Sequence, residues 1–168
     1  MNRLKKLIFL VALVGISPIN FADSSAGFEG MKTMLGEWAG TLNRSTGEVV
    51  ETRSTFRLIS GGNTIIETLV EDGVEMITTY SDNDGEMVVR HYCSLGTEPE
   101  FKVAKATATE LSFTLDESIG YHEGHHDFVQ AISYAMDPNN PNEVVVSSVA
   151  SVGGEAQSGR AVIRRVSE

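Results

Sequence analysis

Short stretches rich in Val, Ile, Thr, Phe and Tyr alternate with clusters of Gly, Asn, Asp and Pro from Gly36 onward. This alternation is typical of β-strands joined by tight turns. Just before these stretches, residues 28–35 place apolar side chains at helical spacing and predict one short helix. The pattern predicts about ten strands, at 36–43, 48–59, 63–71, 74–81, 86–93, 100–106, 110–116, 127–136, 143–152 and 158–166.

The separators between these strands carry turn chemistry. Gly and Asn accept the positive φ of tight hairpins, and they recur in 60–63, 72–73 and 82–85. Residues 137–142 include two prolines, which cannot donate to a ladder, so we expect this segment to lie outside the strands. Sequential strands with short turns predict an all-β, antiparallel, up-and-down lipocalin-like barrel, in which closure removes the exposed edges. A two-sheet sandwich is the alternative.

Alternation within the strands also predicts which side chains face the interior. A hairpin closed at 82–85 would place Tyr80 near Met87 and Met76 near His91. Because the inward sets mix Thr, Ser, Gln and His with aliphatic residues, we expect a partly polar lumen that holds water or a ligand. The inward sets are Met87, Val89, His91 and Cys93; Val74, Met76, Thr78 and Tyr80; Val50, Thr52, Ser54, Phe56 and Leu58; and Phe128, Gln130, Ile132, Tyr134 and Met136.

The segment that precedes the helix has the layout of a secretory signal peptide. A basic head at 2–6 is followed by an apolar run at 7–16 and by small residues at Ala22 and Ala26. The run is well short of the roughly 20 residues that a membrane-spanning helix needs. We therefore expect a leader over 1–22, cut after Ala22 or alternatively after Ala26, and a periplasmic or secreted protein without stable membrane insertion.

Composition narrows the partners of the remaining segment, 23–168, whose length suits a single domain. The full chain has 13 basic and 23 acidic residues, and the leader removes three of the bases and no acid. So acidic a surface repels phosphate backbones and anionic lipid, so no nucleic-acid partner is expected. The single cysteine, Cys93, has no partner in the chain, so packing must hold the domain together, and we expect the thiol to be buried.

The start of the first strand resembles a known class of barrels. A short helix runs into Leu35-Gly36-Glu37-Trp38-Ala39-Gly40, and this arrangement resembles the opening of calycin-like barrels: lipocalins, fatty-acid-binding proteins and haem-binding nitrobindins. In such a barrel Trp38 would close one end, while Gly36 and Gly40 would let backbone pass close to it.

A second resemblance is to a family of exported bacterial proteins of unknown function with a lipocalin-like barrel. It rests on Met76-Ile77-Thr78-Thr79-Tyr80 and on His91-Tyr92-Cys93, followed by Gly96 and Pro99. The resemblance implies a fold and a compartment but no activity. Residues 96–100 read Gly-Thr-Glu-Pro-Glu, where the family pattern reads Gly-Asn-Gln-Pro-Arg, so a ligand role for this loop does not carry over.

Residues 122–126, His-Glu-Gly-His-His, match the H-E-x-x-H pattern of zinc proteases. That motif needs a helix, because only there do the two histidines converge on one metal. Gly120 and Gly124 argue against a helix, so we expect a polar turn at the barrel rim. The alternative is a looser metal site that draws on His122, His125 and His126 with a neighbouring carboxylate.

His91 is the histidine whose predicted face is inward. One histidine can ligate haem iron inside a nitrobindin-like barrel, but that ligand lies near the C-terminus, where this chain has no histidine. We therefore expect His91 to hydrogen-bond to Thr78 or Tyr80. Cys93 lies about 7 Å along the same strand face, beyond hydrogen-bond reach, and no orienting acid accompanies it, so no catalytic residue is assigned.

These patterns predict a binding protein more readily than an enzyme. We expect a small, largely apolar molecule to bind in the lumen without a cofactor. An enzyme or a metal- or haem-binding barrel that uses His91 or the cluster at 122–126 is the alternative, and a structural or protein-partner module is the third possibility. The residues expected to line the ligand site are Trp38, Phe56, Met76, Tyr80, His91, Cys93, Phe113 and Tyr134.

Overall fold

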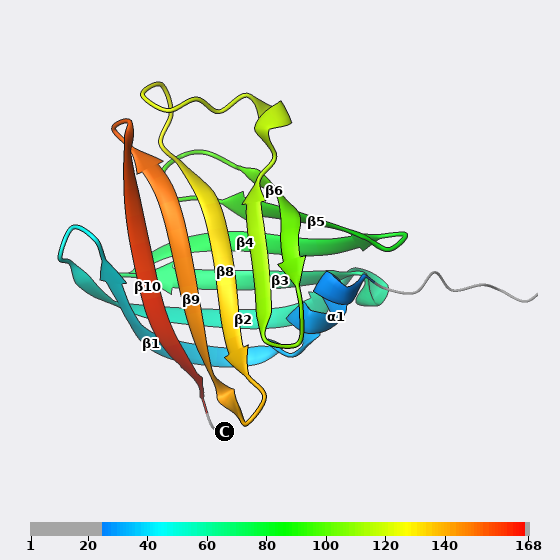
Figure 1. Ribbon diagram of the computed structural model, residues 1–168. Helices are drawn as coiled ribbons and strands as arrows, with labels where there is room; N and C mark the ends of the chain where they lie inside the picture. The colour runs from blue at the N-terminus through cyan, green and yellow to red at the C-terminus, as the bar shows by residue number, and fades with distance from the viewer. Residues whose placement is uncertain (1–24, 167–168) are drawn as a thin grey trace, which may run out of the picture.

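Ten antiparallel strands close into a barrel in the computed structural model, which describes residues 25–166 (Figure 1). Each strand pairs with its neighbour in sequence, and β1 pairs with β10 to complete the ring. The predicted barrel is confirmed, whereas the sandwich alternative is wrong. The predicted leader lies outside the described residues. The strands are β1 (Gly36–Arg44), β2 (Val49–Ile59), β3 (Thr64–Glu71), β4 (Val74–Asn83), β5 (Glu86–Tyr92), β6 (Glu100–Ala106), β7 (Glu110–Leu115), β8 (Phe128–Asp137), β9 (Asn140–Val152) and β10 (Glu155–Arg165).

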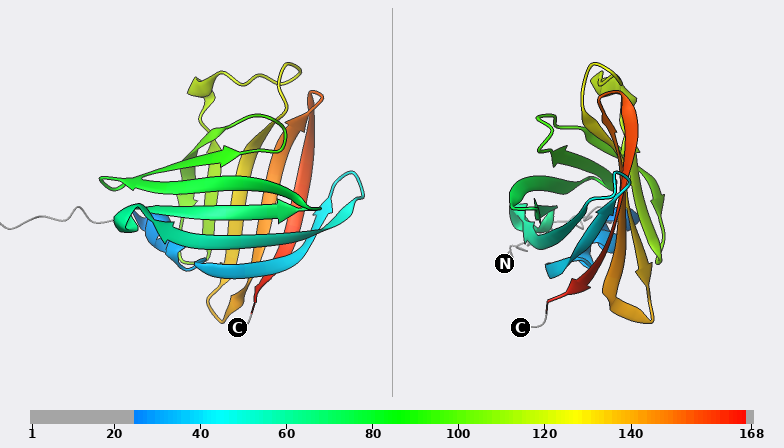
Figure 2. Two further views of the ribbon diagram at one scale, coloured as in Figure 1. Left: turned by 180° about the vertical axis from the view of Figure 1, so that it is seen from behind. Right: turned by 90° about the vertical axis from the view of Figure 1, so that its left-hand side faces the viewer.

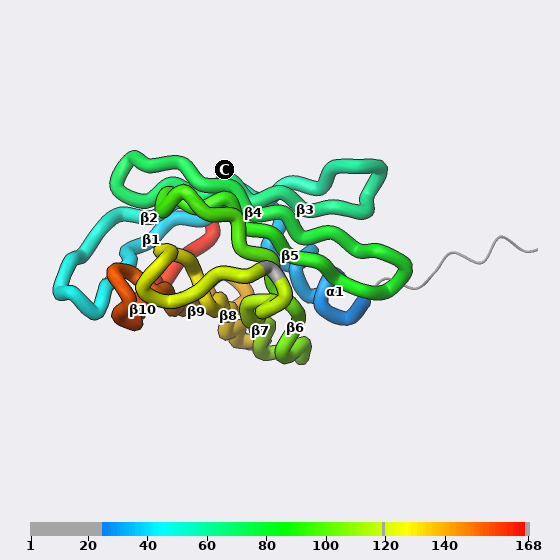
Figure 3. The backbone as a smooth tube through the Cα atoms, turned by 90° about the horizontal axis from the view of Figure 1, so that it is seen from above, coloured from blue at the N-terminus to red at the C-terminus, as the bar shows by residue number. Residues whose placement is uncertain are grey.

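The barrel is flattened, with β2 to β4 in one wall and β7 to β10 in the other (Figure 3). Strands of the two walls run in steeply crossing directions, as the two further views show (Figure 2). Two short 3-10 helices, η1 (Ser60–Gly62) and η2 (Glu117–Ile119), interrupt the connections. No helix within the described range is long and apolar enough to cross a membrane.

The short helix α1 (Ala26–Lys32) packs at one end of the barrel, which we call the closed end. It begins two residues before the predicted start at Phe28, because the side chain of Ser25 caps it by accepting a hydrogen bond from the backbone N–H of Phe28 (3.2 Å). Phe28 and Met31 on its inner face are buried in the barrel core. The helix therefore fills one mouth of the barrel with apolar side chains.

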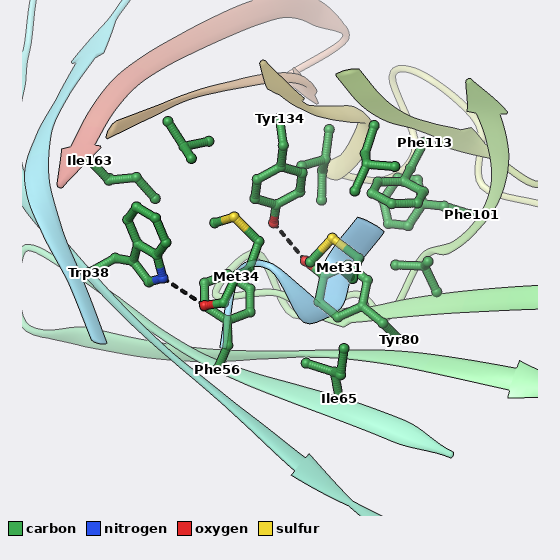
Figure 4. Close-up of a cluster of buried hydrophobic side chains, with 14 of the residues drawn as sticks. Met31, Met34, Trp38, Phe56, Ile65, Tyr80, Phe101, Phe113, Tyr134 and Ile163 are labelled. Carbon is green, nitrogen blue, oxygen red and sulfur yellow. Dashed lines mark hydrogen bonds between the residues drawn. The ribbon is translucent and has the colours of Figure 1, made fainter. Parts of the chain in front are cut away.

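Trp38 completes this closure, as the sequence predicts. Its indole N–H donates to the backbone carbonyl of Met34 (2.6 Å; Figure 4), and the guanidinium of Arg165 lies 4.3 Å from the ring centroid. Gly40 lets β10 approach, because a Cβ at this position would collide with the carbonyl oxygen of Val162. Close strand contact and a buried indole thus depend on the Trp-x-Gly pattern.

The β4–β5 hairpin differs from the prediction by two residues in register. Strand β4 continues to Asn83, so only Asp84 and Gly85 form the turn, both with positive φ. Such a two-residue turn matches the twist of the strands better than the expected four-residue one. In consequence Thr78, not Met76, pairs with His91. The expected pairing of Tyr80 with Met87 is also wrong, because Tyr80 pairs with Val89.

A β-bulge in β8 overturns part of its predicted inward set. Val129 pairs with Ala150 and Ala131 pairs with Val149, which leaves Gln130 as an extra residue. The extra residue shifts the alternation, so that Val129 joins Ile132 and Tyr134 at the interior. Phe128 instead stacks on Tyr121 outside the main core, with ring centroids 5.5 Å apart.

The segment 137–142 is also more ordered than predicted. Strand β8 runs to Asp137 and β9 starts at Asn140, so Pro138 and Asn139 alone form the turn. Pro141 lies inside β9, at the register shift that follows the Met136–Val144 pair. A proline is tolerated there because the shift leaves its nitrogen without a ladder position to fill.

The apolar core occupies the closed half of the barrel (Figure 4). Of the predicted inward residues, Met87, Val89 and His91 are buried and Cys93 is half-buried, so that face assignment is confirmed. Leu58 and Val74 are exposed, because they lie at strand ends beyond the packed interior. The largest side chains of the core include Met31, Met34, Trp38, Phe56, Ile65, Tyr80, Phe101, Phe113, Tyr134 and Ile163.

Candidate functional site

A cavity of about 360 Å³ occupies the half of the barrel opposite α1. It reaches the end where the β1–β2, β5–β6 and β9–β10 connections lie, since Glu48, Leu95 and Ser158 line it there. We call this the open end. A volume of this size suits a small organic molecule. Most of the wall is aliphatic and comes from Leu42, Leu69, Met76, Val129, Ile132, Val146, Ala150, Val152, Ala161 and Ile163.

Three polar side chains cross neighbouring strands at the inner part of this cavity. Glu67 of β3 pairs directly with Thr78 of β4, and Thr78 pairs directly with His91 of β5. All three side chains point inward, are buried and line the cavity. Directly paired residues on one face of a sheet lie within contact distance. We call Glu67, Thr78 and His91 the polar row.

Glu67 is a carboxyl group in the barrel interior, only 4% exposed. One carboxyl oxygen accepts a hydrogen bond from Ser54 (2.7 Å), and the other accepts from Tyr80 (2.8 Å) and Tyr134 (3.2 Å). No basic side chain of residues 25–166 is within hydrogen-bonding or ion-pairing distance of it. Burial raises the pKa of the Glu67 carboxyl, although the hydrogen bonds from Ser54, Tyr80 and Tyr134 act in the opposite direction.

The two tyrosines hydrogen-bond to each other as well as to Glu67. Their hydroxyl oxygens are 2.6 Å apart (Figure 4). Burial, with the neighbouring Glu67 charge, raises the pKa of both Tyr80 and Tyr134 well above 10, so both phenols stay protonated. Both phenols can therefore donate to the Glu67 carboxyl oxygen that they share.

His91 is neutral at physiological pH. Burial lowers the pKa of its imidazole from 6.5 to about 4. Nδ1 and the Thr78 hydroxyl form a hydrogen bond of 2.9 Å, which confirms one of the two contacts expected from the sequence. Among the described residues Nε2 has no hydrogen-bond partner, so this ring nitrogen remains available to a molecule in the cavity.

The charged rim of the cavity is acidic on balance. Arg44 donates to Glu48 (3.1 Å) and to Glu71 (3.3 Å), and all three residues line the opening. Burial raises the pKa of the Glu71 carboxyl, and the Arg44 guanidinium offsets part of that rise. Arg44 is the only lysine or arginine that lines the cavity within residues 25–166, and two carboxylates already engage it.

The structure separates the predicted ligand-site residues into two groups. Met76, His91, Cys93 and Tyr134 line the cavity. Trp38, Phe56, Tyr80 and Phe113 instead pack into the core beneath it, where the Tyr80 ring lies 6.4 Å from Phe56 and 5.8 Å from Phe113. Strand alternation assigned the correct face to these residues but not the depth, which depends on the end that α1 fills.

Glu67 and Ser54 are the polar groups that sequence reasoning missed or undervalued. A signal for Glu67 exists, because the hairpin at Asp72-Gly73 pairs Glu71 with Val74 and therefore Glu67 with Thr78. Thr78 belongs to a predicted inward set, so its partner must also face inward. A glutamate between Ile65 and Leu69 on that face then stands out.

Cys93 shows no sign of activation. It lines the cavity and is half-buried, and burial raises the pKa of its thiol. A protonated thiol is a poor nucleophile. The structure therefore offers no support for a cysteine-based reaction at this position.

The histidines at 122–126 lie in a turn rather than on a helix. The backbone N–H of His122 donates to Nδ1 of His126 (3.3 Å), and the His126 ring meets Tyr121 edge-on at 5.5 Å. Within residues 25–166 no group of three His, Cys, Asp or Glu side chains is arranged to hold a metal ion. The geometry required by the H-E-x-x-H motif is therefore missing.

No protein-family model matches this chain, and no curated protein does. Solved structures similar to it include a redesigned β-barrel that is 13% identical, with 88% of this chain and 100% of that chain covered and a TM-score of 0.41. Another is EF1p2_mFAP2b bound to DFHBI, which is 14% identical over 83% of this chain and 98% of that chain, with a TM-score of 0.45. Likenesses this remote carry no argument about a ligand of this protein.

Proposed function

We propose that this protein binds a small molecule with an apolar body in the barrel cavity. The observation that carries the proposal is the cavity itself, about 360 Å³, open at one end and lined mainly by aliphatic side chains. Transfer of an apolar ligand from water to such a wall contributes about 25 cal/mol per Å² of buried apolar surface. The polar row at the inner part can orient a polar group of the ligand.

A pair of neighbouring serines in β9 allows a matched test. Ser148 lines the cavity, whereas Ser147 precedes it on the strand and therefore faces outward. Ser148→Phe should fill the cavity and abolish binding, while Ser147→Phe should leave binding intact. Titration of both variants with an uncharged alkyl alcohol, followed by calorimetry, measures the difference. Equal binding by the two variants would place the ligand elsewhere.

Native mass spectrometry complements the titration, because a retained natural ligand would appear as added mass. The Ser148→Phe protein should then lack any adduct that the Ser147→Phe protein carries. An adduct of equal abundance in both variants would refute binding in the cavity.

We also propose that the protein is exported and belongs to the family of exported lipocalin-like barrels that its sequence resembles. Cleavage after Ala22 would leave the cap of α1 intact, because Ser25 both caps the helix and donates its backbone N–H to Asp82 (3.1 Å). Cleavage after Ala26 would remove that cap. The geometry therefore favours the first of the two cleavage sites predicted from the sequence.

A further inference from the structure

The carboxyl of Glu67 has unusual partners for a buried acid. Its hydrogen-bond partners are all hydroxyl groups, and no cation of the described chain compensates its charge. A buried carboxylate is normally paired with a basic group, because removal of the charge from water is unfavourable. Burial accordingly raises the pKa of this carboxyl. The barrel thus holds an acid that lacks the counter-charge it would have in a structural ion pair.

The cavity gives a ligand access to this acid. Glu67, Ser54 and Tyr134 all line the cavity and are joined by hydrogen bonds, so their side-chain oxygen atoms meet at one place on its wall. Each of these oxygens keeps a lone pair after the bonds within the protein are made. A group that donates several hydrogen bonds and carries a positive charge fits this arrangement.

Two further polar groups are open to the cavity without partners. The hydroxyl of Thr52, a residue only 3% exposed, has no hydrogen bond to any described residue, although Thr52 lines the cavity. Nε2 of His91, a residue 4% exposed, likewise has no hydrogen-bond partner among the described residues. Both atoms face the cavity, so a bound molecule or water can supply their hydrogen-bond partner.

The cavity offers no free positive charge to an anionic head group. His91 is neutral, and the one guanidinium at the opening, that of Arg44, is held by Glu48 and Glu71. A carboxylate ligand would therefore enter a cavity lined by three acidic side chains, including Glu67, without a free cation to receive it. This repulsion selects against fatty acids.

We propose that the cavity binds an amine, with the ammonium group against Glu67, Ser54 and Tyr134 and the apolar body along the aliphatic wall. The inference rests on the proposed binding function and specifies its ligand class. The ammonium supplies the counter-charge that Glu67 lacks, and its hydrogen bond to the carboxylate is of the charge-assisted, stronger kind.

Three eight-carbon probes with different head groups test this ligand class by calorimetry at neutral pH: octylamine, 1-octanol and octanoate. Their tails bury the same apolar surface, so differences in affinity report on the head group. Octylamine should bind at least about tenfold more tightly than 1-octanol, as one charge-assisted hydrogen bond allows. Octanoate should bind more weakly than 1-octanol.

Two charge-neutralising variants locate the effect. Glu67→Gln keeps the size of the side chain and should reduce octylamine affinity to the level of 1-octanol. Glu75→Gln removes the same charge from the exposed outer face of β4 and should keep the preference for the amine. Far-ultraviolet circular dichroism and retained 1-octanol binding show that the Glu67→Gln barrel is folded.

Octanol binding without a preference for the amine would overturn this inference and leave the proposed function standing. An amine preference that survives in Glu67→Gln would overturn it as well, because the counter-charge would then lie elsewhere. Failure of all three probes to bind the unaltered protein would overturn both the inference and the proposed function.

Discussion

Acidification should destabilise the barrel through His91. Burial lowers the pKa of this imidazole to about 4, against 6.5 for the unperturbed group. Between these two pH values the imidazole is protonated in the unfolded chain but not in the folded protein. The free energy of unfolding therefore decreases as pH falls through this window. Nothing is lost well above pH 6.5, where both states are neutral. Integration of the linkage from pH 7 to pH 4 gives a loss of about 3 kcal/mol.

Urea unfolding of the parent protein and of His91→Asn, at pH 7 and at pH 4, isolates this contribution. Asparagine can keep the hydrogen bond to Thr78 but does not titrate. Glu67, whose pKa is raised by burial, has the opposite effect on stability, but both proteins contain it and its contribution cancels in the difference. The parent should lose about 3 kcal/mol more than the variant. An equal loss in both proteins would show that His91 is not held neutral by burial.

Gly40→Ala should lower the free energy of unfolding by about 1–3 kcal/mol, measured in urea, because its Cβ would collide with Val162. Glu67→Gln should be more stable than the parent at pH 7 and lose this advantage below pH 4.5, since ionisation of a carboxyl with a raised pKa opposes folding. A bulky thiol reagent should label Cys93 much faster in urea than in the native protein. Mass spectrometry of exported protein should find Asp23 as the first residue.

Unchanged stability of Gly40→Ala would mean that β1 and β10 are not in close contact. A Glu67→Gln protein less stable than the parent at neutral pH would show that the hydroxyl bonds outweigh the burial of the charge. Rapid native labelling would place Cys93 on the outer face, and an intact Met1 would refute the leader.

Strand positions could be predicted from the sequence because turn residues and period-two alternation are local properties. The tight turn at Asp72-Gly73 shows this, since both residues adopt a positive φ, which these two residue types tolerate. The buried side of β5 followed from alternation in the same way. Such local signals do not depend on the rest of the chain, so one sequence suffices to find them.

Features that depend on distant parts of the chain were not predictable in this way. The extra residue Gln130 in β8 carries no turn signal, and it is a bulge only because Val129 and Ala131 pair with consecutive residues of β9. The depth of Tyr80 in the barrel is set by α1, far away in sequence. Glu67 lies between these cases, since its inward face follows from a local hairpin but its lack of a cation does not.

The pairing of the first strand with the last has a consequence for the order of folding. Trp38 pairs with Arg165 and Arg44 with Gly159, so the seam joins residues more than a hundred positions apart in the chain. Arg165 also donates to the backbone carbonyls of Leu35 (2.6 Å) and Thr33 (2.9 Å), next to the indole that it covers. Because synthesis proceeds from the N-terminus, the β1–β10 pairing and the contact of Arg165 with Trp38 cannot form until β10 has been synthesised. Until then two strand edges stay unpaired and able to bind other chains.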